Sequence, residues 1–303
     1  MELSIQQCLN IAHQLVDINC RRFIVIGGEV FLKQGWETLV KYLIDNDRDT
    51  SIITNGYLID NELISKLKQT GIKHISLSID GFRDVHDEFR KKGSFDKAID
   101  AIKLLKRNNF VVSVISTLNF KSIKTVNLLY SELRKLNIDA WQLQCCSPFG
   151  NAKNKHYLIP SKKELYNICE FVAIENKIAP FQIAIADNIG YHTYLECDIR
   201  GNIITGYNGC SAGLTTIGID SVGNVRGCES LYDDCFIEGN LLEQSLSDIW
   251  YSPTAFSYNR QFEKELLKGE CAKCDQWYKC AGGCRSFNYF YSGEMFESKI
   301  CLK

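Results

Sequence analysis

Seven cysteines in the last third of the chain have the residue type and the spacing to bind a metal cluster. They are Cys210, Cys228, Cys271, Cys274, Cys280, Cys284 and Cys301. Thiolates held close together on tight turns are the ligands of iron–sulfur clusters. Gly282 and Gly283, between two of the cysteines, would let the backbone fold around such a bulky group. The spacing therefore predicts iron–sulfur chemistry in this segment.

Composition limits the alternatives. The 303 residues include 14 cysteines and no recognisable export signal, and clustered cysteines in such a chain favour metal over disulfides. Zinc is the main competing metal, although zinc ribbons more often carry two CxxC pairs. The 35 basic and 36 acidic residues nearly cancel, and no apolar stretch is long enough to span a bilayer. We therefore expect a cytoplasmic protein that binds neither nucleic acid nor membrane.

A second chemically capable group follows the expected strands of the first two thirds. Gly27, Gly28 and Glu29 come directly after an apolar run. Backbone carbonyls together with a carboxylate suit a primary ammonium, which has three hydrogen-bond donors. The next two expected strands end at Thr54-Asn55-Gly56 and at Ser78-Ile79-Asp80-Gly81. The C-terminal ends of strands are where β/α barrels place their ligands.

Hydrophobic periodicity predicts the elements that would position these groups. Short β-branched runs predict strands over Phe23–Ile26, which is apolar enough to be buried on both faces, and over Ser51–Thr54, His74–Ile79, Val111–Thr117 and Trp141–Cys145. Helical spacing predicts helices over Ser4–Ile18, Gly35–Ile44 and Asp60–Lys68, after caps at Ser94 and Ser161, and around Ser247–Asn259, with capping boxes at Ser4/Gln7 and Ser161/Glu164. This alternation predicts parallel β/α units.

The residue composition and hydrophobic periodicity change near residue 204, where glycines, turns and cysteines replace the long periodic segments. We expect residues 1–203 to form one domain and residues 204–303 a second one that needs metal to fold. Cys145 and Cys146 end an expected strand, and adjacent strand residues face opposite sides. One of these two thiols is therefore expected in the core.

The cysteine spacing, with Gly223 before Cys228 and Gly239-Asn240-Leu241 between the two halves, resembles the SPASM domain of radical S-adenosylmethionine (SAM) enzymes. The resemblance implies an α/β fold in which an incomplete parallel (β/α)6-type radical SAM barrel precedes a small SPASM domain. It implies two auxiliary 4Fe-4S clusters, one on Cys210, Cys228 and Cys284 and one on Cys271, Cys274, Cys280 and Cys301. A fourth ligand of the first cluster would come from Cys235 or from a substrate thiol, and Cys235 also fits an ordinary thiol.

The same resemblance implies where SAM binds. The implied residues are Gly27, Gly28, Glu29, Thr54, Asn55, Ser78, Asp80 and Arg90. Glu29 would bind the amino group of SAM, although Val30 stands where the family normally has proline. Asp80 would face the methionine or ribose end, and Arg90 would pair with the SAM carboxylate. Asp80 also fits a turn, and Arg90 a solvated charge.

Radical SAM catalysis, as the family is known, needs a CxxxCxxC loop, and this sequence contains none. We expect the chain as written to be truncated and inactive in cleaving SAM. A start codon assigned too late and a split or decayed gene are favoured over a binding protein that keeps only the SPASM clusters. The apolar run at residues 23–26 favours the first two explanations, because without a neighbouring strand it leaves an aggregation-prone edge.

With that loop present, the resemblance implies hydrogen abstraction from a peptide or protein by a radical derived from SAM. Glu229, directly after Cys228, is a candidate catalytic base that also fits an exposed turn carboxylate. The implied partners are a peptide or protein substrate and an electron donor such as a flavodoxin or ferredoxin. The alternative from another class is a non-catalytic iron–sulfur electron-transfer or peptide-binding module, followed by a zinc-stabilised scaffold.

Overall fold

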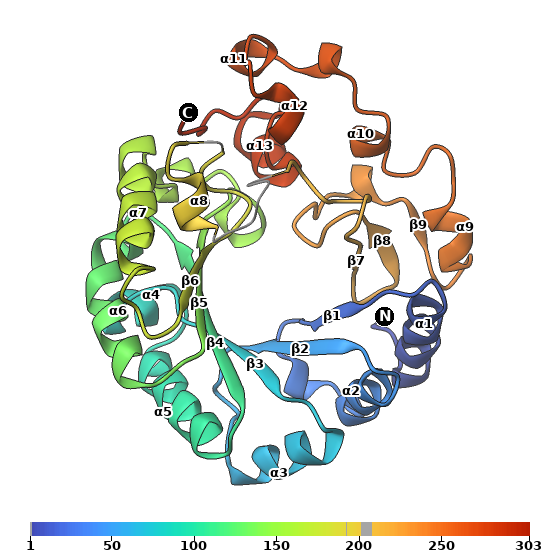
Figure 1. The fold of residues 1–303 in the computed structure, drawn as a ribbon. Helices are drawn as coiled ribbons and strands as arrows, with labels where there is room; N and C mark the ends of the chain where they lie inside the picture. The colour runs from blue at the N-terminus through green and yellow to red at the C-terminus, as the bar shows by residue number, and fades with distance from the viewer. Residues whose placement is uncertain (1, 192, 201–207) are drawn as a thin grey trace.

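The computed structural model describes residues 2–191, 193–200 and 208–303. Six strands form one sheet in which every pairing between neighbours is parallel and the strand order follows the chain. They are β1 (Arg22–Val25), β2 (Asp49–Thr54), β3 (His74–Ser78), β4 (Val111–Leu118), β5 (Ala140–Cys145) and β6 (Gln182–Ile185). The expected parallel β/α arrangement is confirmed. Figure 1 shows the strands as a curved sheet with helices on its outer side.

The helices connect the strands and form much of the C-terminal third. They are α1 (Ile5–Asp17), α2 (Trp36–Asp45), α3 (Asn61–Thr70), α4 (Arg83–Phe89), α5 (Ser94–Arg107), α6 (Val126–Lys135), α7 (Lys162–Glu175), α8 (Glu196–Ile199), α9 (Leu246–Trp250), α10 (Ser257–Arg260), α11 (Gly269–Ala272), α12 (Trp277–Cys280) and α13 (Arg285–Ser292). None of the helices in the described part of the chain has the length and apolar character to cross a bilayer.

Side chains alternate between the two faces of the sheet, as the pleat of a strand requires. On β4, Val112 and Val114 are fully buried in the main core, which the helices cover. Ser113 and Ile115 point to the other, inner face and are only half-buried. Hydrophobic burial on the outer face therefore holds the sheet, and the inner face stays accessible.

Strand β1 is not buried on both faces, so that expectation is wrong. Ile24 is 57% exposed and Ile26 is 46% exposed, while Phe23 and Val25 are half-buried against the helical side. The reason is position: β1 lies at the end of the strand order and, among the strands of the described residues, pairs only with β2. An apolar residue on the inner face of an edge strand has no neighbour on one side.

Most local signals give the observed boundaries, with two corrections. Both expected capping boxes are present, Ser4/Gln7 at α1 and Ser161/Glu164 at α7. Ser94 does not cap α5. Gly93 occupies the N-cap in a left-handed conformation, with φ of 80°. The Asp87 carboxylate provides the cap instead, because it accepts hydrogen bonds from the amides of Gly93 at 2.5 Å and Phe95 at 2.9 Å.

The second correction concerns the helix expected around Ser247–Asn259. The structure has two short helices there, α9 and α10, separated by residues 251–256. Pro253 lies in this gap and has no backbone amide to donate to a helical hydrogen bond. Phe256, directly before α10, has a left-handed backbone with φ of 55°, and its side chain is fully buried.

The C-terminal part contains a small antiparallel sheet of β7 (Gly218–Ile219), β8 (Asn224–Arg226) and β9 (Gly239–Asn240). This sheet and α9 pack against α1 in one hydrophobic cluster that includes Leu15 and Val225. Figure 1 shows the C-terminal segment running from beside β1 across the open side of the curved sheet toward β6. The domain boundary expected between residues 203 and 204 lies outside the described residues.

A buried ion pair holds the turn between β7 and β8. The Asp220 carboxylate accepts hydrogen bonds from the amides of Val222 and Asn224, each at 3.0 Å, and from Arg226 Nη1 at 2.7 Å. Both side chains of the pair are at most 9% exposed. Burial raises the pKa of Asp220, but these hydrogen bonds outweigh burial and hold the pKa below its usual range.

We expect Asp220→Asn to lower the free energy of unfolding by about 3 kcal/mol, because it leaves a buried guanidinium without its counter-charge. A lowered folded-state pKa stabilises the protein above the unfolded value of about 4, and this contribution disappears as the pH falls below it. Urea unfolding between pH 3 and 7 measures both effects. The matched control is Asp234→Asn, because Asp234 lies 3.8 Å from the same guanidinium but is 99% exposed. Equal losses in the two variants would contradict the prediction.

Candidate functional site

Glu29 joins the C-terminal ends of β1 and β2. Its carboxylate accepts a hydrogen bond from the Thr54 hydroxyl at 2.8 Å through Oε1 and one from the Asn55 amide at 3.1 Å through Oε2. Each carboxylate oxygen can accept a further hydrogen bond. A Cβ placed on Gly27 or Gly28 would meet no atom within 4 Å, so the backbone before Glu29 borders open space. This end of the sheet therefore offers a fixed carboxylate beside accessible backbone.

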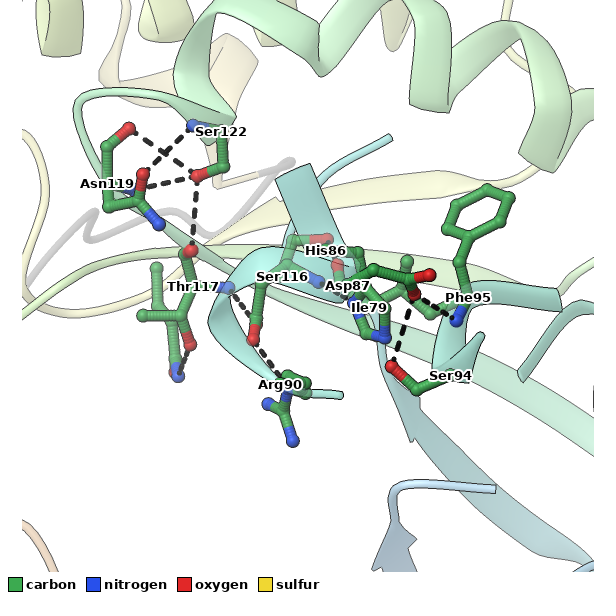
Figure 2. Close-up of polar contacts among 12 residues, drawn as sticks. Ile79, His86, Asp87, Arg90, Ser94, Phe95, Ser116, Thr117, Asn119 and Ser122 are labelled. Atoms are coloured by element: carbon green, nitrogen blue, oxygen red, sulfur yellow. Dashed lines mark hydrogen bonds and ion pairs between the residues drawn. The ribbon is translucent and has the colours of Figure 1, made fainter. Parts of the chain in front are cut away.

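Asp80 follows β3 and binds Arg90. The Asp80 carboxylate accepts hydrogen bonds from Arg90 Nε at 2.6 Å and from the Thr117 amide at 3.0 Å, and Asp80 is 8% exposed. Figure 2 shows the two terminal nitrogens of Arg90 pointing away from the other labelled side chains. The sequence analysis expected both Asp80 and Arg90 to contact SAM but did not predict the ion pair between them. Asp80 thus holds a guanidinium whose outer edge can meet an anion.

A buried histidine fixes the segment that carries Arg90. The Asp80 amide donates a hydrogen bond to His86 Nδ1 at 3.1 Å, and His86 is 1% exposed. Burial is the main reason that the pKa of His86 is lowered. Because Nδ1 accepts a hydrogen bond, the neutral ring carries its proton on Nε2. Figure 2 shows His86 and Asp87 together on α4, directly before Arg90.

The inner face of the sheet next to these groups is polar. Ser78, Thr117 and Gln144 are half-buried there, and Gln144 Nε2 donates to the Thr117 hydroxyl at 3.0 Å. Cys145 is 2% exposed in the main core, whereas Cys146 is half-buried. Burial and the nearby charge of Asp80 raise the pKa of the Cys146 thiol to about 11. One of the two adjacent thiols is in the core, as expected.

This edge suits the head group of an amino acid. Glu29 and Asp80 follow strands two positions apart, which corresponds to about 10 Å at the usual spacing between strands. A carboxylate at one end and a guanidinium at the other complement an ammonium and a carboxylate. The residues present therefore fit the methionine end of SAM. Thr54 and Asn55 position Glu29. Ser78, the last residue of β3, is half-buried on the inner face.

Four cysteines converge in the last segment of the chain. Cys271, Cys274, Cys280 and Cys301 lie close enough for their charges to raise one another's pKa values. Amides donate to two of these thiols at 3.4 Å, Ser298 N to Cys271 Sγ and Gln276 N to Cys274 Sγ. These four residues are here called the second cysteine set.

The first cysteine set comprises Cys210, Cys228 and Cys284. Cys210 lies close enough to raise the pKa of both other thiols. Cys228 Sγ also donates to the carboxylate of Glu229 at 3.3 Å, and Glu229 is exposed. Cys235 is exposed as well, and its thiol lies 3.6 Å from the Tyr289 hydroxyl.

Burial around both cysteine sets favours thiolates only where a metal coordinates them. Burial raises the pKa of Cys280 to about 11 and that of Cys284 to about 12. Isolated thiolates are therefore disfavoured here, whereas metal coordination deprotonates a thiol outright. In the described part of the chain, no three His, Cys, Asp or Glu side chains are close enough to share one metal ion. The thiolates of a 4Fe-4S cluster bind different irons and stand farther apart.

Two buried hydroxyl groups without hydrogen-bond partners in the described part of the chain indicate whether the cysteine sets could hold iron–sulfur clusters. Ser298 Oγ, beside the second cysteine set, and Tyr258 Oη, beside the first, are buried and have no hydrogen-bond partner among the described residues. An unpaired buried polar group costs about 1–3 kcal/mol. Cluster sulfurs are hydrogen-bond acceptors, so a bound cluster would satisfy both groups. The donor set and its surroundings therefore fit iron–sulfur clusters.

Comparisons with known proteins match both the strand-end site and the cysteine-rich C-terminal part to known families. Residues 1–125 match the radical SAM superfamily, and residues 210–275 match the SPASM domain, an iron–sulfur cluster-binding domain. The chain has a radical SAM domain and a SPASM domain. The expected recognition and fold class are thus confirmed. Iron–sulfur clusters and SAM, the expected cofactors, are those of these two families.

Relatives of this radical SAM/SPASM chain include two kinds of enzyme. An AdoMet-dependent heme synthase of Methanosarcina barkeri is 25% identical over 98% of this chain and 86% of the relative. The mycofactocin maturase MftC of Mycolicibacterium smegmatis is 26% identical over 95% of this chain and 72% of the relative. Streptococcus suis SuiB, solved with S-adenosylmethionine, has the same fold, with a TM-score of 0.77 and 20% identity over 99% of this chain and 71% of SuiB.

Sequence reasoning missed three residues at the cysteine sets. Tyr191 is 1% exposed, packs against Cys280 and Cys301, and accepts a hydrogen bond from the Cys284 amide at 3.1 Å. It therefore lies between the two sets. The others are the hydroxyl residues Tyr258 and Ser298. None of the three belongs to a local motif, and the fold alone brings them to the cysteines.

Proposed function

We propose that this chain binds SAM at the strand ends of β1–β3 and two 4Fe-4S clusters in its C-terminal part, and serves in the radical modification of a peptide or protein. The sorting of the seven cysteines into two sets, beside a sheet edge that offers Glu29 and Arg90, supports this proposal. When bound, SAM and an iron–sulfur cluster supply radical chemistry that removes hydrogen atoms.

The strand-end residues have distinct roles in this proposal. Glu29 accepts the ammonium of SAM, with Thr54 and Asn55 holding the carboxylate in place. Arg90 pairs with the SAM carboxylate, and Asp80 orients the guanidinium through Nε. Gly27 and Gly28 leave room for the cofactor, and Ser78 faces it from the inner side of the sheet.

The cysteine sets hold the auxiliary clusters, which when bound supply one-electron storage. Cys271, Cys274, Cys280 and Cys301 bind one cluster, and Cys210, Cys228 and Cys284 bind the other. Glu229 is the proposed base. Its exposed carboxylate lies beside Cys228 and can take a proton from a substrate that approaches this cluster.

The proposed substrate is a peptide or protein. One relative is named as a maturase, and SuiB has been solved with its precursor peptide SuiA. The heme synthase among the relatives provides a second candidate class, a porphyrin. A small redox protein such as a flavodoxin or ferredoxin would donate electrons. We place the protein in the cytoplasm because iron–sulfur clusters are oxygen-sensitive.

The alternative is a non-catalytic iron–sulfur electron-transfer or peptide-binding module, since these 303 residues contain no CxxxCxxC loop. The test compares them with a form carrying such a loop ahead of residue 1, both supplied anaerobically with SAM and dithionite. We expect the present chain to bind SAM without cleaving it and the extended form to release 5′-deoxyadenosine. An extended form that binds iron but releases no 5′-deoxyadenosine would favour the non-catalytic module instead. Mass spectrometry of candidate peptides and porphyrins then identifies the substrate class.

A further inference from the structure

Each cysteine set has one buried hydroxyl beside it that donates to no group in the described part of the chain. Ser298 is 8% exposed, and its oxygen is inaccessible to solvent. The oxygen of Tyr258 is also inaccessible. The two residues lie on different segments and next to different sets.

Ser298 contacts the second cysteine set through its backbone. Its amide donates to Cys271 Sγ at 3.4 Å. Its side chain lies against the glycine turn between Cys280 and Cys284, because a Cβ on Gly283 would be 3.4 Å from the Cβ of Ser298. Ser298 therefore lies between Cys271 and the glycine turn that joins Cys280 to Cys284.

Tyr258 is held against the first cysteine set by aromatic and glycine contacts. Its ring packs edge-on against Phe236, with centroids 6.0 Å apart, in the hydrophobic cluster that also contains Cys210 and Cys228. The hydroxyl oxygen lies over Gly227, at a place that any Cβ on that residue would fill.

We propose that Ser298 and Tyr258 donate O–H···S hydrogen bonds to the iron–sulfur clusters held by the second and first cysteine sets, and so raise the reduction potential of each cluster separately. This inference rests on the proposed binding of clusters at these sets. The physical reason is that a hydrogen bond to a cluster sulfur stabilises the additional negative charge of the reduced cluster. Among the described residues, neither hydroxyl has another acceptor.

The test is an anaerobic redox titration of the reconstituted 303-residue protein, followed by electron paramagnetic resonance, with Ser298→Ala and Tyr258→Phe. Each change removes one oxygen atom. We expect each variant to keep its iron and to lower the midpoint potential of one cluster, with the other unchanged, so each variant is the control for the other. Ser292→Ala is a further control, because the Ser292 hydroxyl already donates to the Asn288 carbonyl at 3.1 Å. It should shift neither potential.

The outcomes separate this inference from the function it rests on. A protein that binds no iron would overturn the proposed cluster sites themselves. Bound clusters whose potentials are unchanged in both variants, or change equally in Ser292→Ala, would overturn only the hydrogen bonds. If Ser298→Ala loses its cluster, Ser298→Thr keeps the hydroxyl and is expected to retain the original potential. A lowered potential in Ser298→Thr would contradict the assignment.

Discussion

Replacing Cys271 and Cys274 together with serine is expected to remove about four of about eight irons per chain, because these thiols belong to one four-cysteine set. The other cluster should remain, since its proposed ligands Cys210, Cys228 and Cys284 are unchanged. Iron and sulfide analysis after anaerobic reconstitution measures the effect. Serine binds iron–sulfur clusters less well than the softer thiolate, so partial replacement of the lost ligands is not expected.

The matched control is Cys197→Ser, because Cys197 is exposed on α8 and belongs to neither set. It should keep all of its iron. Loss of all iron in the double variant would mean that the two sets do not bind separate clusters. An unchanged iron content would remove Cys271 and Cys274 from the ligand set altogether.

Replacing Glu29 with glutamine is expected to weaken SAM binding about 10- to 100-fold, the effect of losing a charge-assisted hydrogen bond worth about 1.5–3 kcal/mol. The amide would also place a donor opposite the Thr54 hydroxyl or the Asn55 amide, which now donate to the carboxylate. Equilibrium binding of SAM to the reconstituted protein measures the change.

Glu62→Gln is the control for this prediction. Glu62 is 76% exposed on α3 and pairs with Lys66. It should bind SAM as the unchanged protein does. Equal affinities in Glu29→Gln and the unchanged protein would show that the ammonium does not bind at the end of β1.

Regular elements were predictable from sequence where the signal was local. Ser4/Gln7 and Ser161/Glu164 satisfy the first amides of their own helices, so four-residue motifs suffice to place both starts. The α5 cap could not be found this way, because Asp87 reaches it from six residues before Gly93 across a turn. Strand β6 was missed because only Ile183 and Ile185 carry its alternation.

The candidate sites were predictable to the level of residue type but not of partner. Cysteine spacing indicated an iron–sulfur segment, the resemblance to the SPASM domain implied how the cysteines divide into two sets, and the strand ends pointed to Glu29 and Asp80. The Asp80–Arg90 pair depends on how α4 returns to β3, and the positions of Tyr258 and Ser298 depend on packing between distant segments. The exposure of Ile24 depends on its place in the sheet, which the composition of its strand does not reveal.

Iron binding by the C-terminal cysteines tests the account most directly. Mössbauer spectroscopy and iron analysis of the anaerobically reconstituted chain should give about eight irons in two 4Fe-4S clusters, in a brown protein. A colourless protein that takes up zinc in place of iron, or one that binds no metal, would contradict it.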